Sequence, residues 1–416
     1  MRIVVVGAGH AAVQLVTSLR QDGFEGTLTM VGDEPHLPYQ RPPLSKTFMK
    51  DGDASRLLLK PESFFASNQI EVIKGTRVTE IDRANKHIVT DRDDTIGYDR
   101  LVLAIGAENV RPPLTGADHP ALLELRTLAH AETIRERLAV AKQAIVIGGG
   151  FIGLEFAAMA ALQRVTSTVT EASSRLMARA VSPAISAHFL DFHRSIGNTV
   201  LLDAPVAEIA GSNEGRIESV RLADGQSLAG ELVLLAAGVK PSTTLAEKAG
   251  LQCRNGIVVD GQLTTDDPAI FAIGDCAAVL TIDGIHQRLE SVQAATDQAK
   301  HLSRYLAKGE GGTSYHAVPW FWSDQGDQKL QIAGLPSAAN YFEARPGDGS
   351  CLTVLGYRDD HLVSVETVNA AGDHMAARRL LALPGSLTRA RIEADGHDLR
   401  AIAKSMAPPT LRRARA

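Results

Sequence analysis

The sequence has little cysteine and no long apolar run. Its 3 cysteines stand at positions 253, 276 and 351, and this spacing excludes a CxxC redox pair. We therefore expect a reducing compartment, and we expect any electrons handled by the protein to pass through a cofactor rather than a dithiol. No run of about 18 apolar residues is present, so the sequence predicts no membrane span.

An excess of one charge is also lacking. The net charge is −5 at pH 7, and no basic stripe interleaved with aromatic residues predicts nucleic-acid binding. The N-terminus begins directly on an expected strand, residues 2–6, which leaves no room for a signal peptide, so we expect a cytoplasmic protein. A chain of 416 residues with 36 glycines and 44% hydrophobic residues predicts two or three domains of the α/β class.

The sequence does contain glycine-rich turns, in two places. The first lies in RIVVVGAGHAAVQLVTSLRQDGFEGTLTMVGDE, which predicts a strand, a glycine turn, a helix, a second strand and an acid. Gly7, Gly9 and Ala12 occupy the GxGxxG/A positions, and Asp33 or Glu34 follows the second strand, where a ribose hydroxyl would bind. The amides of the turn and of the helix N-terminus would face a pyrophosphate.

The same unit recurs in QAIVIGGGFIGLEFAAMAALQRVTSTVTEA, where Gly148, Gly150 and Gly153 form the turn and Glu171 ends the second strand. One glycine motif is weak evidence, but two complete units in register predict two bound dinucleotides. Because a carboxylate accepts hydrogen bonds from a 2′-hydroxyl and repels a 2′-phosphate, Glu171 favours NADH over NADPH. We interpret Arg175, four residues further on, as a surface residue or an adenine-side contact.

Further buried strands are expected at residues 100–105, 232–236 and 270–273, and their placement suggests that one nucleotide domain is interrupted by the other and then resumes. From residue 314 the pattern changes to alternating, tryptophan-containing strands, which are typical of an antiparallel sheet. The terminal MAPPTLRRARA has no apolar periodicity and is expected to be frayed, with solvated arginines. The predicted domains are 1–109 with 240–313 for one nucleotide, 110–239 for the other, and a C-terminal domain at 314–416.

Five segments, in their order and spacing, resemble one family. They are VGDEPHLPYQRPPLSK, IGGGFIGLEFAA, AIFAIGDCA, RLESVQAATDQAK and VPWFWSDQ. They are similar to segments of the FAD- and NADH-dependent ferredoxin reductases of bacterial cytochrome P450 and ring-hydroxylating dioxygenase systems, of the putidaredoxin-reductase type. The resemblance covers residues 1–380 and implies an α/β, glutathione-reductase-like flavoprotein with two Rossmann-like domains and a C-terminal α+β domain.

The resemblance implies that the N-terminal motif binds FAD and the second motif binds NADH. Lys46 would project toward the flavin and pair with Glu155, so that its charge favours electron density on the reduced flavin; a structural ion pair is the alternative. Asp275 would bind the ribityl chain or a phosphate, unless it only caps the helix expected to follow. The residues assigned to FAD are Gly7, Gly9, His10, Ala11, Ala12, Asp33, Glu34, Arg41, Lys46, Val78, Ile105, Gly106, Arg126, Asp275, Val292 and Trp322. Those assigned to NAD are Gly148, Gly150, Phe151, Ile152, Gly153, Glu155, Glu171 and Gly238.

The implied activity is that of a ferredoxin–NAD(+) reductase. A hydride would pass from NADH to FAD, and single electrons would then pass to an acidic [2Fe-2S] ferredoxin that serves a cytochrome P450 or a ring-hydroxylating oxygenase. Arg288, Lys300 and Arg304 are candidates for a docking patch, although such residues are often only a solvated face. No metal site is expected, and the protein would be a monomer or a weak dimer.

Alternatives on the same fold are an NADH oxidase, a rubredoxin-type reductase, or an apoptosis-inducing-factor-like flavoprotein that regulates association with partners. By the resemblance alone, the tryptophan-containing segment argues against the first two, and the lack of an extended basic surface argues against the third. Three residues depart from the family pattern: Ile105 stands where threonine is usual, Gly326 where a large residue is usual, and Gln328 where leucine is usual. A glycine at 326 is expected to loosen its strand or to leave a void.

Overall fold

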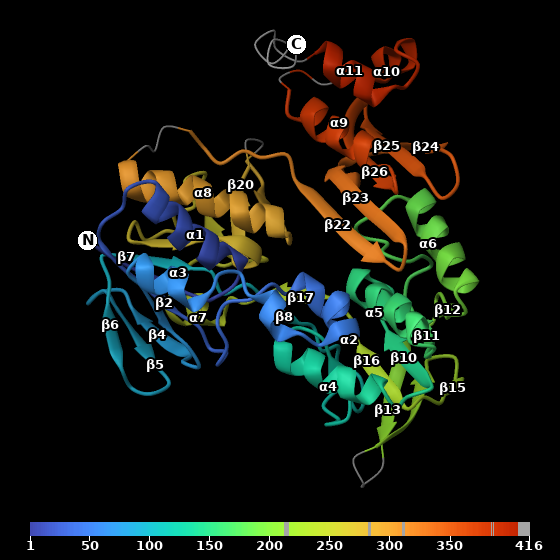
Figure 1. Cartoon of the computed structure of the whole chain (residues 1–416), viewed down its shortest axis with the longest axis horizontal. Coiled ribbons are helices and arrows are strands. Elements are labelled where there is room, and N and C mark those ends of the chain that lie inside the picture. The colour runs from blue at the N-terminus through green and yellow to red at the C-terminus, as the bar shows by residue number, and fades with distance from the viewer. Residues whose placement is uncertain (212–215, 282–283, 310–312, 384, 386, 407–416) are drawn as a thin grey trace. The chain divides into compact units, whose positions relative to one another are not determined.

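The computed structural model of the chain describes residues 1–211, 216–281, 284–309, 313–383, 385 and 387–406. These residues form two units, each assembled from separate stretches of sequence (Figure 1). No helix among the described residues is long and apolar enough to cross a membrane. The expected fraying of the terminal segment concerns residues 407–416, which lie outside the described residues. The first unit contains Met1–Pro43, Asp53–Asn109 and Val239–Ala317, and the second contains Leu44–Gly52, Val110–Gly238 and Val318–Ala416.

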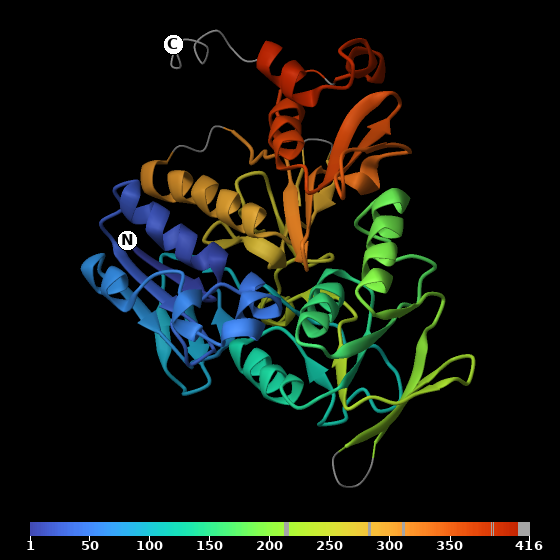
Figure 2. The ribbon, with the colours of Figure 1, turned by 45° about the vertical axis from the view of Figure 1, so that its right-hand side comes forward.

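The core of the first unit is a parallel sheet with the strand order β19-β7-β1-β2-β3. Its strands are short apolar runs because a parallel sheet is covered on both faces. Helices α1 (His10–Gln21) and α8 (Val292–Lys308) lie side by side (Figures 1 and 2). The strands of this sheet are β1 (Arg2–Val6), β2 (Thr27–Val31), β3 (Ile70–Ile73), β7 (Arg100–Leu103) and β19 (Ile270–Ala272).

Smaller ladders and short helices complete the first unit. One antiparallel ladder is built from β4 (Val78–Asp82), β5 (His87–Thr90) and β6 (Thr95–Gly97). A second ladder contains β18 (Ile257–Val259), β20 (Ala277–Leu280) and β21 (His286–Gln287). The strands β8 (Ala107–Asn109) and β17 (Val239–Pro241) pair with each other in antiparallel fashion. The helices are α3 (Glu62–Ser67) and α7 (Thr244–Lys248), with 3-10 turns at η2 (Ala54–Leu57) and η3 (Gly274–Cys276).

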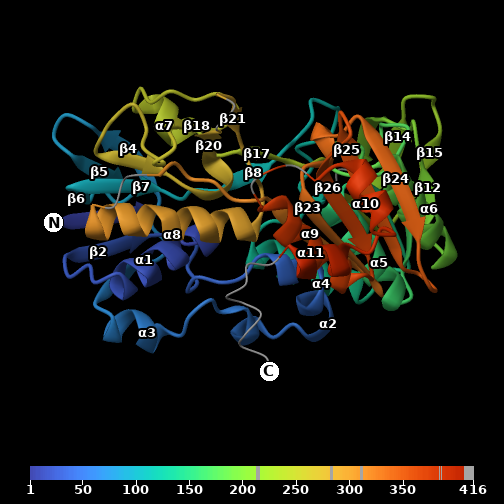
Figure 3. The same ribbon diagram turned by 90° about the horizontal axis from the view of Figure 1, so that it is seen from above.

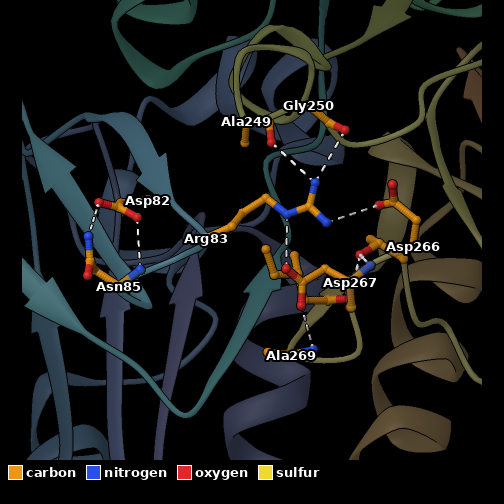
Figure 4. Close-up of polar contacts among 10 residues, drawn as sticks. Asp82, Arg83, Asn85, Ala249, Gly250, Asp266, Asp267 and Ala269 are labelled. Carbon is orange, nitrogen blue, oxygen red and sulfur yellow. Dashed lines mark hydrogen bonds and ion pairs between the residues drawn. The ribbon is translucent and has the colours of Figure 1, made fainter.

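Arg83, which follows β4, joins two distant stretches of the first unit (Figure 4). Its Nε donates to Asp267 Oδ2 at 2.9 Å, and its Nη1 donates to the carbonyls of Ala249 at 3.4 Å and Gly250 at 3.3 Å. A second carboxylate, that of Asp266, lies 3.9 Å from Nη2. One half-buried guanidinium therefore ties the β4–β6 ladder to the segment that follows α7.

Replacing Arg83 with methionine is expected to lower the free energy of unfolding of the first unit by about 1–2 kcal/mol. The substitution keeps the aliphatic stem but leaves Asp267 and two carbonyls without their donor. Urea unfolding followed by circular dichroism measures this loss. Lys86→Met is the matched control, because it removes an exposed cation from the same ladder. An equal loss in the free energy of unfolding for both variants would contradict the role of Arg83 in joining these segments.

The second unit contains a parallel sheet with the order β12-β11-β10-β16-β9, again made of short apolar strands. Its strands are β9 (Leu123–Glu124), β10 (Gln143–Ile147), β11 (Thr166–Thr170), β12 (Thr199–Leu201) and β16 (Leu232–Leu235). Its helices are α2 (Thr47–Asp51), preceded by the 3-10 turn η1 (Pro42–Ser45), α4 (Leu128–Leu138), α5 (Phe151–Leu162) and α6 (Pro183–Ser195). An antiparallel ladder is formed by β13 (Val206–Gly211), β14 (Ile217–Leu222) and β15 (Ser227–Leu228).

The rest of the second unit contains an antiparallel sheet, as the alternating C-terminal pattern predicted, and the helices that follow it. The strand order is β22-β23-β26-β25-β24, and α9 packs against β23 and β26 (Figure 3). The strands are β22 (Trp320–Gln325), β23 (Gln328–Gly334), β24 (Tyr341–Pro346), β25 (Leu352–Arg358) and β26 (His361–Val368). The helices are α9 (Ala371–Leu381), α10 (Arg389–Ala394) and α11 (Leu399–Ser405), with a 3-10 turn at η4 (Pro336–Ala338).

A charged cluster closes the end of this sheet. Glu343, Glu393 and His397 place ligand-type atoms within 4.8 Å of one another. Arg345 donates to Glu343 at 3.0 Å, and Arg389 lies 2.8 Å from Glu393. Two guanidiniums among the same carboxylates would repel a cation, so we interpret the cluster as an ion-pair network that fixes α10 against β24.

Gly326 lies in the two-residue turn that joins β22 to β23, where Gln325 pairs with Gln328. Its φ is +61°, and an added Cβ would lie 2.8 Å from Phe192 Cζ. The positive φ of the turn favours glycine, and the phenyl ring leaves little room for a Cβ. The expectation that this glycine loosens the strand or leaves a void is therefore wrong, because the ring of Phe192 takes the place of the missing side chain.

Candidate functional site

The two glycine turns have the same local structure. The φ of Gly7 is +115° and that of Gly148 is +114°. A Cβ on Gly7 would lie 2.2 Å from Ala104 O, and one on Gly148 would lie 2.3 Å from Ala236 O. In each unit a neighbouring strand therefore approaches so closely that only glycine fits, which is the first requirement of the dinucleotide fingerprint.

The helix that follows each turn begins with uncapped amides. Gly9 is the N-cap residue of α1 and Gly150 that of α5, and no side chain among the described residues caps either helix. A Cβ on either glycine would meet no described atom within 4 Å. Neither helix has an acidic residue in its first turn. Two helix starts with uncapped amides, open space and no acid in the first helical turn fit the pyrophosphate groups of two dinucleotides.

The acids after the second strands are not equivalent in the two motifs. The Gly7 amide donates to Val31 O and the Gly148 amide to Thr170 O, both at 2.8 Å. This register places Gly32 where the second motif has Glu171. The acid of the first motif must therefore come from one of the next two residues, as the sequence suggested.

One of these two acids lies in a cluster of predicted FAD residues. Glu34 accepts from Tyr39 Oη at 2.6 Å and from Arg41 Nη2 at 2.7 Å. Burial and the nearby charge of Arg41 lower the pKa of His10, the first residue of α1, to about 4. Asp33 instead is 54% exposed and pairs with Arg77. The structure thus brings Glu34, Arg41 and a neutral His10 together at the first turn.

Asp275 lies on the 3-10 turn η3, which leads into strand β20 and not into a helix. Ile273 is the residue at the cap position of this turn and Asp275 lies inside the turn, so the alternative that Asp275 is a helix cap is wrong. Gly274, with φ +76°, would place a Cβ 3.2 Å from Ala11 Cβ. Its amide donates to Gln298 Oε1 at 2.7 Å. The turn therefore holds Asp275 beside the start of α1, where the first motif lies.

The other residues assigned to FAD divide between the units. Val78 is buried in the core of the first unit, Ile105 is half-buried at the end of β7, and Val292 begins α8. Ala12 is fully buried in α1, and Gly106 has a φ of +69°. Those assigned residues that belong to the second unit are Lys46, Arg126 and Trp322.

In the second motif Glu171 is fixed by the backbone. Its Oε2 accepts from the Gly149 amide and its Oε1 from the Ser173 amide, both at 2.8 Å. Arg175 is part-buried and turns back into its own loop: Nη1 donates to Val181 O at 2.8 Å and Nη2 to Ala178 O at 2.6 Å. It is therefore neither a surface residue nor a free cation beside the carboxylate.

The remaining residues assigned to NAD lie at the start of α5 and at the end of β16. A Cβ on Gly153 would lie 2.3 Å from Gly148 O, so this glycine allows the helix to pack tightly on its strand. The ring of Phe151 lies 4.6 Å from that of Phe321, and Ile152 is 43% exposed. Gly238, which follows β16, has a φ of +99°.

The ion pair expected between Lys46 and Glu155 is present within the second unit. Lys46 Nζ lies 2.8 Å from Glu155 Oε2, and the two side chains are 16% and 3% exposed. Two hydroxyls that sequence reasoning missed complete the site: Ser45 Oγ donates to Oε2 at 2.5 Å, and Ser323 Oγ donates to Oε1 at 2.7 Å. Ser45 adjoins Lys46 in the sequence, but nothing local indicates Ser323.

The cysteines form no dithiol. All three are free, and Cys276 is buried while Cys253 and Cys351 are partly buried. Burial raises the pKa of the Cys253 and Cys276 thiols to about 11. Neither is a thiolate at neutral pH, so neither is a reactive redox thiol.

Residues 1–299 match the family described as pyridine nucleotide-disulphide oxidoreductase, and residues 320–403 match the reductase C-terminal family. The chain belongs to the pyridine nucleotide-disulphide oxidoreductase family. This membership confirms the predicted fold class and the predicted kind of enzyme, an FAD-dependent oxidoreductase linked to a pyridine nucleotide. The second match extends past residue 380 to residue 403, so α10 and most of α11 lie within the matched C-terminal region.

Individual members confirm the resemblance to ferredoxin reductases. Rhodocoxin reductase of Rhodococcus erythropolis is 42% identical over 394 residues, 93% of this chain and 91% of that protein. The ferredoxin reductase for the CYP199A2 system of Rhodopseudomonas palustris superposes with a TM-score of 0.92 at 41% identity, over 97% of this chain and 99% of that one. Putidaredoxin reductase, in its covalent complex with putidaredoxin, superposes with a TM-score of 0.92 at 31% identity, over 97% and 98%.

Proposed function

We propose that this oxidoreductase takes a hydride from NADH onto FAD and passes single electrons to a [2Fe-2S] ferredoxin that serves a cytochrome P450 or a ring-hydroxylating oxygenase. The observation that carries the proposal is the pair of uncapped, open helix starts in a chain without a dithiol. Electrons that reach FAD must then leave to an external acceptor. The putidaredoxin reductase–putidaredoxin complex is a structural neighbour with such an acceptor.

The protein's own groups hold and orient the cofactors. Bound FAD accepts a hydride and releases electrons singly, and this chemistry belongs to the cofactor. The turn at Gly7 and Gly9 would hold the FAD pyrophosphate, with Glu34 or Asp33 at the ribose, and the turn at Gly148 and Gly150 would hold that of NADH. By the family resemblance, Lys46 would present its ammonium to the flavin, and Glu155 would hold that ammonium in place.

The patch proposed to dock an acidic ferredoxin contains fewer residues than the sequence suggested. The side chain of Arg288 is only 12% exposed and is paired with Glu290, so we leave it out of the patch. Lys300 and Arg304 are exposed on successive turns of α8 and remain candidates. A cytoplasmic location and a monomer or weak dimer complete the proposal.

Replacing Glu171 with glutamine is expected to lower the preference for NADH over NADPH by about tenfold or more. The amide keeps the shape of the carboxylate, but it no longer repels a 2′-phosphate. The ratio of kcat/KM values for the two coenzymes measures the change. Arg175→Gln is the control and should leave the ratio unchanged, because this guanidinium is bound within its own loop. If Arg175→Gln and not Glu171→Gln lost the preference for NADH, the assignment of that preference to Glu171 would be refuted.

The deciding experiment is cytochrome c reduction by the purified protein with NADH, with and without a bacterial [2Fe-2S] ferredoxin. We expect a large increase that depends on the ferredoxin, and little activity with NADPH. Rubredoxin and oxygen uptake are measured in parallel. An increase with rubredoxin alone, or oxygen uptake indifferent to either protein, would replace the proposal with a rubredoxin reductase or an NADH oxidase.

A further inference from the structure

A line of buried polar side chains runs through the second unit to Glu155. Ser323 and Gln325 lie on the same face of β22, which packs against α5. His193 is near the end of α6, and Asn198 follows it. Asn198 is 4% exposed, and the other three side chains are completely buried. Polar groups buried so fully must satisfy one another, so the position of each proton can be worked out.

The donor–acceptor direction of the hydrogen bonds is fixed by two backbone groups at Asn198, the end of the line farthest from Glu155. The Ser167 amide lies 3.3 Å from Asn198 Oδ1, and Asn198 Nδ2 lies 3.3 Å from Ala157 O. A backbone N–H can only donate and a carbonyl can only accept, which fixes the orientation of the Asn198 amide. Asn198 Nδ2 must then also donate to His193 Nδ1, at 3.1 Å.

The remaining protons follow in order. Since His193 Nδ1 accepts, the imidazole is neutral and carries its proton on Nε2, which donates to Gln325 Oε1 at 2.9 Å. Burial lowers the pKa of His193, in agreement with a neutral ring. Gln325 Nε2 then donates to Ser323 Oγ at 3.3 Å and faces Met177 Sδ at 3.8 Å. The single proton of Ser323 is left for Glu155 Oε1, at 2.7 Å.

We propose that Asn198, His193, Gln325 and Ser323 are positioning residues that hold the Glu155 carboxylate against Lys46 through hydrogen bonds that all point toward that carboxylate. Each donor polarises the next, so the chain directs positive ends of dipoles at Glu155 Oε1. Oε2 is thereby left for Lys46 and Ser45. None of these four residues needs to touch a cofactor.

The hairpin of β22 and β23 also contains a matched control for Gln325. Gln328, like Gln325, is a buried glutamine whose Oε1 bonds a histidine Nε2 of α6, that of His188 at 3.0 Å. Its Nε2 donates to Asp327 at 2.7 Å and does not lead to Glu155. Gln325→Glu and Gln328→Glu therefore make the same change in side chain and charge, at positions that are 0% and 6% exposed, but only the first reverses a donor in the chain.

The test measures the acetylation rate of Lys46 in the full-length protein by mass spectrometry. An ammonium held against a carboxylate offers no free amine, so looser positioning raises this rate. We expect an increase of about fivefold in Gln325→Glu and in Ser323→Ala, and none in Gln328→Glu. Ser323→Ala adds neither a charge nor volume, so it keeps the test decisive if the glutamate variants fail to fold. Equal rates in Ser323→Ala and the unchanged protein would overturn the proposal.

Stopped-flow reduction of the flavin gives the second readout. At saturating NADH the rate of flavin reduction is expected to fall about tenfold in Gln325→Glu and Ser323→Ala, because both variants loosen the hold on Glu155. This second readout rests on the proposed function, whereas the acetylation rate does not. If the acetylation rate changes in a protein that reduces no ferredoxin, only the proposed function is contradicted. If the acetylation rate is unchanged in an active reductase, only the proposed positioning chain is contradicted.

Discussion

Replacing Lys46 with methionine is expected to slow the reduction of the flavin by NADH about a hundredfold and to destabilise the second unit by about 3 kcal/mol. The loss of stability arises because Glu155, 3% exposed, keeps its charge and loses its ionic partner. The loss of rate follows from the role proposed for Lys46, whose ammonium would no longer face the reduced flavin. Stopped-flow absorbance and urea unfolding measure the two effects separately.

The double variant Lys46→Met/Glu155→Met separates a structural ion pair from a functional one. Removing both charges replaces the buried pair with apolar side chains of similar length, so stability is expected to return to within about 1 kcal/mol of the original. The rate is expected to remain low. Recovery of the rate together with the stability would show that the pair is only structural, which is the alternative that the sequence left open.

Replacing Glu366 with glutamine is expected to stabilise the protein by about 3 kcal/mol at pH 8 and to have little effect at pH 4.5. Glu366 lies on β26 and is fully buried. Its Oε1 accepts from the Ser182 amide at 2.9 Å, while its Oε2 has no hydrogen-bond partner among the described residues. Burial raises the pKa of this carboxyl from 4.5 to about 7, against the opposing effects of the Ser182 hydrogen bond and the charge of Arg175.

The sign follows from proton counting. Between pH 4.5 and about 7 the folded chain keeps a proton on Glu366 that the unfolded chain has released, so this residue's contribution to stability falls as the pH rises. Above that window both states are ionised, and the full cost of the buried charge remains. Glutamine accepts the same hydrogen bond and does not titrate. Urea unfolding of both proteins at several pH values gives the difference, and a difference that stays constant with pH would contradict the assignment.

The sequence predicted those parts of the site that depend on local geometry. The turns at Gly7 and Gly148 follow from strand, turn and helix signals within thirty or so residues, and Glu171 follows from the end of a strand. The resemblance added the pairing of Lys46 with Glu155. Lys46 can reach Glu155 because the segment Leu44–Gly52 belongs to the second unit. The segments on either side of it in the sequence belong to the first unit.

The parts that the sequence did not predict depend on contacts between distant elements. Gly326 looked like a defect, because the ring of Phe192 that fills its place lies on another element, helix α6. Ser323 reaches Glu155, and Gln325 reaches His193, only through the packing of β22 on helices of the second unit. The alternative that Asp275 only caps a helix could not be dismissed from the sequence, because a short 3-10 turn and a following strand have no distinct local signal.

The pairing of β8 with β17 bears on how such a protein could have been assembled in evolution. Asn109 lies opposite Val239, so the chain leaves the first unit and returns to it at adjacent positions of one ladder. The folding of the segment between β8 and β17 itself brings the two ends of that segment together. The length of this segment therefore places no strain on the ladder. A nucleotide-binding cassette could therefore enter, lengthen or be exchanged at this point while the host sheet keeps its register.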